Sequence, residues 1–305
     1  MIRIEAKSRL HFGFLNAAAP PGQRRFGGVG LMVNDPALSL VVEPAKDWSA
    51  AGPLAERAVE FARQFAASVP ADLVKPQRIV IEKAPPVHAG LGSGTQLALA
   101  VARALNRAWE LPALPAVELA RRVGRGRRSA LGIHGFEQGG FLVEAGKLEP
   151  AEISPLVARL PFPEDWRVLV VIPANPDAMH GHREADALAR LPHDDRTTER
   201  LCRLVLVGML PALAARDLAA FSEALFDFNR LVGEQFSPVQ GGPFAPSSAP
   251  IVRCLRSAGI RGVAQSSWGP TVAAVGEQER LDALLPRLRE ELELVDTPII
   301  TTASN

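Results

Sequence analysis

Short runs of alternating apolar and polar residues dominate the beginning of the chain. A period of two predicts β-strands, because successive side chains of a strand point to opposite faces. A loop marked by Pro20, Pro21 and Gly22 separates two of these runs. The pattern predicts strands over residues 2–5, 11–15, 28–33 and 38–43, and further strands over 77–84 and 139–146.

Apolar residues recur at spacings of three and four in three other stretches, which predicts helices. These helices span residues 53–68, 93–109 and about 116–123. The second is predicted to begin at Ser/Thr residues and to end before the sequence ELP. Segment 124–140 is too rich in Gly and Arg to be regular throughout.

Four prolines between residues 150 and 165 mark a boundary, after which an apolar strand over 166–173 opens a second half. Asp194 and Asp195 are expected to cap the first helix that follows. The order β-α-α-α-β-β-α-β predicts an α+β sandwich. Helices are predicted over 197–214, 217–232, 247–258 and 277–293, and strands within 261–275 and 298–303.

Composition and charge exclude several classes of protein. With 305 residues, 47% of them apolar, the chain can form one large or two medium domains. A net charge of +1, with basic residues spread along the chain, gives no support for a nucleic-acid or membrane surface. The N-terminus lacks the apolar core of a signal peptide, so a cytoplasmic protein is expected. Cys202 and Cys254 are expected to be buried, reduced thiols.

The sequence HAGLGSGTQ joins the strand predicted over 77–84 to the long helix after it. Glycines permit positive φ angles and close approach of a ligand, and a helix start presents unpaired N–H groups. The stretch lacks the Lys of a Walker A motif and the third glycine of a dinucleotide fingerprint. A tight turn with a capped helix is the alternative. A phosphate or pyrophosphate site is expected at Gly90, Leu91, Gly92, Ser93, Gly94 and Thr95.

Further polar stretches suit a phosphorylated ligand. Arginines bind phosphate through two parallel hydrogen bonds, although each cluster could also be a solvated loop. Ser266, Ser267 and Trp268 lie between two apolar strands, where Trp268 either stacks on a ring or fills the core. Gln240 either reaches the site or belongs to a turn. The arginines concerned are Arg9, Arg24, Arg25, Arg125, Arg127 and Arg128.

Other polar residues carry weaker expectations. His11 is expected to lie in the second strand. Asn229 and Glu184 are expected at the surface of helices. His180 and His182 form either a metal pair or, with no third ligand nearby, a polar loop.

The order of these stretches resembles the superfamily of galactokinase, homoserine kinase, mevalonate kinase and phosphomevalonate kinase (GHMP). Its phosphate motif, Pro-x-x-x-Gly-Leu-Gly-Ser-Ser-Ala, matches from Pro86 to Ser93, and Gly94-Thr95 replaces the final Ser-Ala. One branch is more similar still, the β-ribofuranosylaminobenzene 5′-phosphate synthases of methanopterin biosynthesis. Six stretches match that branch in order: SRLHFGFLN, RRFGGVGL, GLGSGTQ, GRGRRSALGIHGFEQGGF, VGEQFSPVQGG and QSSWGPT.

This resemblance implies an α+β, GHMP-kinase-like two-domain fold. Residues 1–160 would form a phosphate-binding domain like domain 2 of ribosomal protein S5, and residues 161–305 a ferredoxin-like α/β sandwich. The implied reaction joins phosphoribosyl pyrophosphate to 4-aminobenzoate or 4-hydroxybenzoate, and it releases CO2 and pyrophosphate. Mg²⁺ and a homodimer are also implied. The choice between the two acids and the Mg²⁺ ligands stay open.

Under this resemblance, the glycine loop binds pyrophosphate and the arginines bind the 5′-phosphate. His134, Glu137 and Gln138 are expected to contact the para substituent or Mg²⁺, and Phe136 and Trp268 to flank the ring. Kinases of the superfamily commonly place an Asp base before the equivalent of Gly139-Gly140, where this chain has only Glu137. An ATP-dependent kinase of the same superfamily and an inactive phosphate-ligand sensor are the alternatives.

Overall fold

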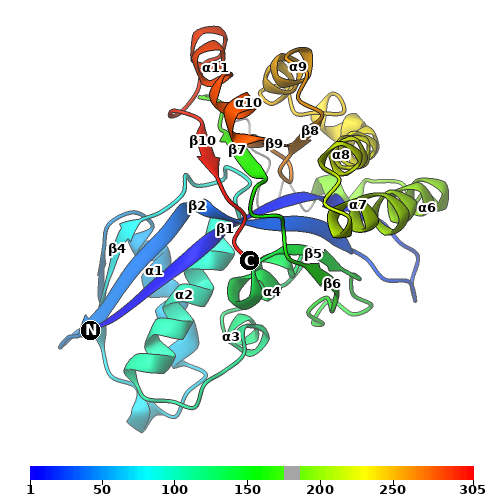
Figure 1. Ribbon diagram of the computed structural model, residues 1–305. Coiled ribbons are helices and arrows are strands. Elements are labelled where there is room, and N and C mark those ends of the chain that lie inside the picture. Colours follow the sequence, from blue (N-terminus) through cyan, green and yellow to red (C-terminus); the bar gives the residue numbers. More distant parts are fainter. Residues whose placement is uncertain (175–185) are drawn as a thin grey trace.

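The computed structural model describes residues 1–174 and 186–305. The chain forms two α/β units that meet along a long two-stranded ribbon (Figure 1). His180, His182 and Glu184 lie outside the described residues. Among the described residues, no helix combines the length and the apolar character needed to cross a membrane.

Two long antiparallel strands, β1 (Ile2–Phe14) and β2 (Gly28–Pro44), form the centre of the first sheet. The expectation of four short strands was wrong, because β-bulges between Ala6 and Ser8 and between His11 and Gly13 let the pairing continue. The other strands of this sheet are β3 (Ser49–Ala51), β4 (Gln77–Lys83), β5 (Phe141–Glu144) and β6 (Leu156–Leu160).

Helices cover one side of this sheet, and α2 (Ser93–Ala108) is the central one (Figure 1). A short helix, α4 (Leu131–Gln138), forms within the segment that is rich in Gly and Arg. It packs closely because a Cβ on Gly135 would lie 2.4 Å from Met32 Cγ. The other helices of this half are α1 (Ala55–Ala66), the 3-10 turn η1 (Ala71–Leu73) and α3 (Ala116–Arg122).

The second sheet is antiparallel, with the strand order β10-β7-β9-β8. Strand, helices, two strands, helices and strand follow one another, as in ferredoxin-like folds, so the α+β prediction is confirmed. The strands are β7 (Arg167–Val171), β8 (Gly262–Gln265), β9 (Val272–Gly276) and β10 (Ile299–Thr301).

The helices of the second half differ in detail from the prediction. Asp194 caps α6, as expected for the helix predicted from residue 197, by accepting hydrogen bonds from the N–H groups of Arg196 and Thr197. The stretch 277–293 forms two helices, because Pro286 cannot donate the hydrogen bond that would continue the first. These helices are α6 (Asp195–Leu204), the π-helix η2 (Val205–Met209), α7 (Leu210–Ala214), α8 (Leu218–Gln240), α9 (Ala249–Ser257), α10 (Gln278–Asp282) and α11 (Leu285–Glu291).

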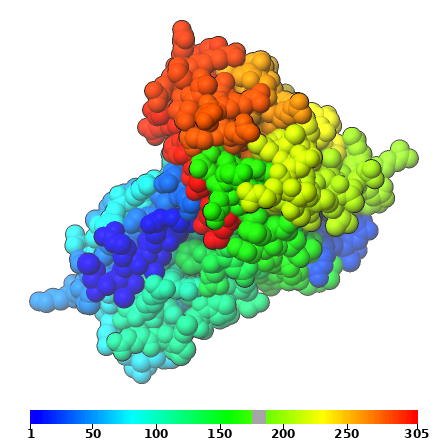
Figure 2. All heavy atoms as spheres, viewed as in Figure 1, coloured from blue at the N-terminus to red at the C-terminus, as the bar shows by residue number. Residues whose placement is uncertain are grey.

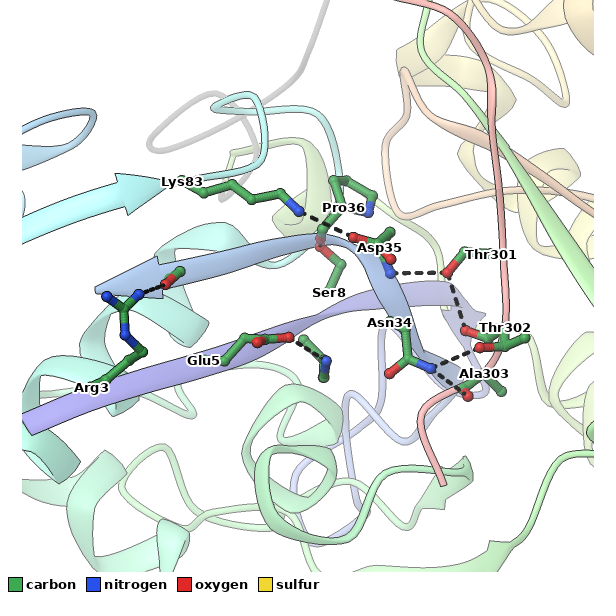
Figure 3. Close-up of polar contacts among 12 residues, drawn as sticks. Arg3, Glu5, Ser8, Asn34, Asp35, Pro36, Lys83, Thr301, Thr302 and Ala303 are labelled. Atoms are coloured by element: carbon green, nitrogen blue, oxygen red, sulfur yellow. Dashed lines mark hydrogen bonds and ion pairs between the residues drawn. The ribbon is translucent and has the colours of Figure 1, made fainter. Parts of the chain in front are cut away.

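The last residues of the chain fasten the second unit to the first (Figures 2 and 3). Asn34 Nδ2 donates to Thr302 Oγ1 (2.8 Å) and to the carbonyl of Ala303 (3.1 Å), and the N–H of Asp35 donates to Thr301 Oγ1 (3.0 Å). One hydrophobic core also combines residues of both units, among them Leu10 and Val275. The domain limits at 160 and 161 stay a prediction.

The two cysteines lie in different environments. Cys254 is buried on α9, as expected, whereas Cys202 is exposed. The expectation for Cys202 was wrong, because α6 buries the face that carries Thr197 and Leu201 and leaves the neighbouring position in solvent.

Candidate active site

The glycine loop between β4 and α2 packs against the second unit. Gly90 and Gly92 have φ angles of 80° and 72°. A Cβ on Gly90 would lie 2.6 Å from the carbonyl oxygen of Ser266, so only glycine permits this approach. Ser266 Oγ donates a 2.7 Å hydrogen bond to the carbonyl of Gly90. The two predicted stretches are therefore in direct contact.

The start of α2 has the geometry of an anion site. The first hydrogen bonds of the helix run from the N–H groups of Thr95 and Gln96 to the carbonyl of Gly92. The N–H groups of Ser93 and Gly94 come before these bonds, at the positive end of the helix dipole. This arrangement suits a phosphate or pyrophosphate.

Three guanidinium groups surround this helix start. A Cβ on Gly94 would lie 2.6 Å from Arg125 Nη2 and 2.8 Å from Arg57 Nη2, and a Cβ on Gly92 would lie 3.4 Å from Arg9 Nε. Burial, then the charges of Arg57 and Arg127, lower the pKa of Arg125 to about 10. A cationic cluster that is costly by itself suits a polyanionic ligand.

Arg9 and Arg125 were predicted from the sequence for a phosphate site, whereas Arg57 was not. Arg57 lies in the first turn of α1, and its guanidinium lies 5.9 Å from the ring centroid of Phe61. The sequence signal was weak, because an Arg on a helix is usually a solvated residue. Only the packing of α1 beside α2 brings it to the site.

The other predicted arginines lie elsewhere or at the edge. Arg24 donates to the carbonyl of Gly146 (2.8 Å) and pairs with Glu152 (3.2 Å). Arg25 lies 4.9 Å from the ring centroid of Phe26. Arg127 is exposed and Arg128 is half-buried.

The contacts of His134, Glu137 and Gln138 lie outside the glycine loop. His134 Nε2 lies 2.8 Å from the carbonyl oxygen of Ser154. Glu137 forms an ion pair with Arg103 of α2, and Arg103 also lies 5.7 Å from the ring centroid of Phe136. The carbonyl of Gln138 accepts from Arg159 (2.9 Å). The catalytic roles of these residues stay predictions.

A pocket opens where β1 meets α8 and the turn after β8. Four of the residues that line it are Phe or Trp, and the rings of Trp268 and Phe236 lie 4.5 Å apart. Of the predicted residues, Gln240, Ser267 and Trp268 line it. Residues from both units complete the lining: His11, Phe12, Gly13, Phe14, Asn229, Val232, Gly233, Phe236, Pro243 and Gln265.

Asn229 joins the two units beneath this pocket. Its Nδ2 donates to the carbonyls of Phe12 (2.6 Å) and Gln265 (2.9 Å), and its Oδ1 accepts from the N–H of Gln265 (2.7 Å). Asn229 is 5% exposed, so the expectation of a surface position was wrong. The cause is the packing of α8 on β8, which turns this face of the helix inward.

Strand β1 connects the glycine loop to the pocket. The N–H of Arg9 donates to the carbonyl of Leu91 (3.0 Å). Two residues further along, the N–H of His11 donates to Ser266 Oγ (3.0 Å), and the N–H of Ser267 donates to the carbonyl of His11 (2.7 Å). One strand therefore positions the anion site and the pocket relative to each other.

A buried acid lies beside His11 and was not identified from the sequence. Glu144, at the end of β5, accepts hydrogen bonds from Ser129 Oγ (2.6 Å) and the N–H of Ala130 (2.7 Å). Burial raises the pKa of Glu144 to about 7. The only sequence signal was a carboxylate that ends an apolar strand, which is too common to be informative.

The family profile described as the GHMP kinases N terminal domain matches residues 54–139, and the GHMP kinases C terminal profile matches residues 209–294. The β-ribofuranosylphenol 5′-phosphate synthase of Methanothermobacter thermautotrophicus is 33% identical over 299 residues, which cover 90% of this chain and 89% of that protein. The synthase of the same name from Archaeoglobus fulgidus is 30% identical, with 90% and 88% covered.

Solved structures agree on the fold. A mevalonate kinase from Methanococcus jannaschii superposes with a TM-score of 0.75 at 13% identity, over 100% of this chain and 98% of that chain. A mevalonate diphosphate decarboxylase from Enterococcus faecalis superposes with a TM-score of 0.63 at 17% identity, over 99% and 98% of the two chains. The predicted GHMP-kinase-like fold is confirmed.

Proposed function

The chain belongs to the β-ribofuranosylphenol 5′-phosphate synthase family of the GHMP superfamily, and from this membership we propose that it joins phosphoribosyl pyrophosphate to 4-hydroxybenzoate. The products are a C-riboside 5′-phosphate, CO2 and pyrophosphate, and the pathway is tetrahydromethanopterin biosynthesis. The phenol in the relatives' name favours 4-hydroxybenzoate as the acid. 4-Aminobenzoate is the second substrate to test.

The observation that carries this proposal is a contact between two parts of the site. One is a positively charged helix start that suits an anion, and the other is a pocket with aromatic rings in its walls. Ser266 bonds the carbonyl of Gly90 in the glycine loop, and the next two residues, Ser267 and Trp268, line the pocket. A pyrophosphate at the start of α2 and an aromatic ring beside Trp268 would therefore be neighbours. Holding the two reactants in contact is the main requirement of this bimolecular reaction.

Departure of pyrophosphate places negative charge on the leaving group. The N–H groups at the start of α2, together with Arg9, Arg57 and Arg125, would stabilise that charge. The apolar walls formed by Trp268 and Phe236 would exclude water, which would otherwise capture the ribose carbon. The 5′-phosphate site stays a prediction at the remaining arginines.

Mg²⁺ enters the proposal as an ion that the substrate carries. Within residues 1–174 and 186–305, no three His, Cys, Asp or Glu side chains form a group that could hold a metal. The described residues thus do not fit a metal site built from protein carboxylates. Pyrophosphate oxygens and water would supply the ligands, as Mg²⁺ commonly accepts.

A kinase activity is not favoured. A kinase requires a base for the substrate hydroxyl. Glu137, the only acidic residue before Gly139-Gly140 in the segment, is ion-paired with Arg103. The curated relatives are named as synthases.

A homodimer and a cytoplasmic location complete the proposal and rest on the family resemblance. Light scattering coupled to size-exclusion chromatography would test the dimer. A mass equal to one chain, about 32.6 kDa, would contradict it.

The deciding experiment incubates the protein with phosphoribosyl pyrophosphate, Mg²⁺ and carboxyl-labelled 4-hydroxybenzoate. We expect equal amounts of labelled CO2 and pyrophosphate, and a riboside phosphate in the mass spectrum. A parallel incubation replaces phosphoribosyl pyrophosphate with ATP and follows ADP. ADP formation with no CO2 release would favour the kinase and contradict the proposal.

A further inference from the structure

His11 is an unsatisfied polar residue on the wall of the aromatic pocket. His11 is among the residues that line the pocket, together with Phe14 and Trp268, and it is only 2% exposed. Among the described residues, neither ring nitrogen has a hydrogen-bond partner. Buried polar groups are normally paired, so an unpaired one beside a pocket indicates a partner on the ligand.

The groups around His11 make its ring an acceptor. Arg9 lies on the same strand, and Glu144 faces it from β5. Burial, and then the charge of Arg9, hold the pKa of His11 well below its ordinary value, so the ring is neutral. A neutral imidazole has one nitrogen that accepts a proton.

We propose that His11 is the catalytic base that takes the proton of the para hydroxyl group of the aromatic acid. This inference rests on the proposed function. It assigns a catalytic role to a residue for which the sequence predicted only a place in a strand. His11 lies two residues from Arg9, so the base and the anion site are carried by the same strand.

The hydroxyl proton passes to His11, and the C–O bond gains carbonyl character. The ring carbon that bears the carboxylate bonds to ribose C1, and the C1–O bond to pyrophosphate breaks with its electron pair leaving on pyrophosphate. The C–CO2 bond then breaks, its pair restores the aromatic ring, and the phenolate oxygen takes the proton back from His11. No external reagent is consumed.

Glu144 is positioned to stabilise the imidazolium formed during this step. A Cβ on Gly28 would lie 3.2 Å from His11 Nε2 and 3.4 Å from Glu144 Oε1, so glycine lets both side chains occupy this space. Ser129 Oγ and the N–H of Ala130 hold the carboxylate in place. Glu144 is a positioning residue here, since it acts through His11.

The two candidate acids distinguish a catalytic role of His11 from a structural one. The hydroxyl of 4-hydroxybenzoate must lose its proton as the ring attacks. The amino group of 4-aminobenzoate can release its lone pair with no proton transfer. A base is therefore needed for the first acid only.

The test measures kcat for His11→Gln and His11→Asn with each acid. We expect kcat with 4-hydroxybenzoate to fall by about 100-fold or more, and kcat with 4-aminobenzoate to change by less than about threefold. Pyrophosphate titration of each variant verifies that the anion site is intact. His193→Gln, a histidine outside the pocket, is the matched control.

A second measurement uses 3,5-difluoro-4-hydroxybenzoate, whose fluorines acidify the hydroxyl group. An ionised hydroxyl needs no base, so with this acid the kcat of each His11 variant should be less than about tenfold below the kcat of wild type. Equal losses with both acids, or an unchanged deficit with the fluorinated acid, would overturn the role of His11. Wild-type protein that releases CO2 from neither acid would overturn the proposed function itself.

Discussion

The two ends of the site are built on opposite principles. The anion end is cationic and uses backbone N–H groups at the start of α2, with Arg9, Arg57 and Arg125 around them. The pocket end carries the rings of Phe and Trp residues, and neither ring nitrogen of the buried His11 has a hydrogen-bond partner among the described residues. The first end attracts charge, and the second excludes water.

This difference assigns binding of the phosphorylated substrate to the anion end, and the choice and reaction of the second substrate to the pocket end. A helix start with arginines binds any phosphorylated ligand, so the anion end by itself does not distinguish a kinase from a synthase. The aromatic walls and the buried base determine which second substrate is accepted and what happens to it. Substitutions at the two ends should therefore affect different substrates.

The largest effect is expected at the anion end. Gly92 has a φ of 72°, which a β-branched residue does not adopt without strain, and a Cβ there would lie 3.3 Å from Arg9 Cβ. Gly92→Val should weaken phosphoribosyl pyrophosphate binding by more than about 100-fold in a calorimetric titration. 4-Hydroxybenzoate binding should stay within about threefold of wild type.

Gly259→Val is the matched control for this substitution. Gly259 also has a positive φ, 81°, but a Cβ there would approach only Nη2 of the Arg280 side chain within 3 Å. This variant should lose some stability and retain binding. Wild-type affinity in the Gly92 variant would contradict the assignment of the loop.

The next effect is a dependence of stability on pH at the pocket end. Because burial raises the pKa of Glu144 from 4.5 to about 7, the folded protein holds this proton more tightly than the unfolded chain does. The free energy of unfolding contributed by this group is therefore lost as the pH rises through about 7.

Glu144→Gln should remove that loss. The difference in free energy of unfolding between wild type and variant should change by up to about 3 kcal/mol from about pH 4.5 to about pH 8, measured by urea denaturation. Glu149→Gln, which removes an exposed carboxylate, should show no such change. Parallel pH profiles for all three proteins would refute the raised pKa.

A smaller effect is expected for single arginines of the anion end. Arg125→Gln or Arg57→Gln should raise the Kd for phosphoribosyl pyrophosphate by about 10- to 100-fold, since a hydrogen bond to a charged group contributes about 1.5–3 kcal/mol. Thermal unfolding of the ligand-free variants should show no loss of stability, because each substitution relieves repulsion within the cluster.

The surface variant Arg78→Gln, which only breaks a pair with Glu43, serves as the control.

Arg127→Gln should raise the Kd for phosphoribosyl pyrophosphate by only about threefold, because Arg127 is exposed and its charge is screened by water. The Kd for the aromatic acid should change less. Equal losses for both substrates would indicate a folding role for these arginines.

The smallest effect is expected for the aromatic wall. Trp268→Leu removes a ring that lies 4.5 Å from Phe236. KM for the aromatic acid should rise by about 2- to 12-fold, with KM for phosphoribosyl pyrophosphate unchanged, since ring pairs contribute about 0.5–1.5 kcal/mol. Trp48→Leu alters an aromatic pair with Trp109 outside the pocket and should change neither KM. A larger effect on phosphoribosyl pyrophosphate would move Trp268 to the anion end.

The sequence by itself determined the fold class and the glycine loop at the start of α2. The glycines of the loop, the helix start and the hydroxyl residues adjoin one another in the chain, so their geometry is local and carries a recognisable signal. The alternation of apolar residues likewise predicted most strands of both sheets. It failed at β1 and β2, because bulges that keep a strand paired have no signature in hydrophobic pattern.

Only the tertiary structure decided the pocket end. His11, Asn229 and Trp268 come from a strand, a helix and a turn that are far apart in the sequence, and only packing makes them neighbours. Burial also determined the protonation of two groups at this end, because desolvation keeps the His11 ring neutral and raises the pKa of Glu144. Local sequence specifies backbone shape, whereas desolvation depends on every element that packs around a group.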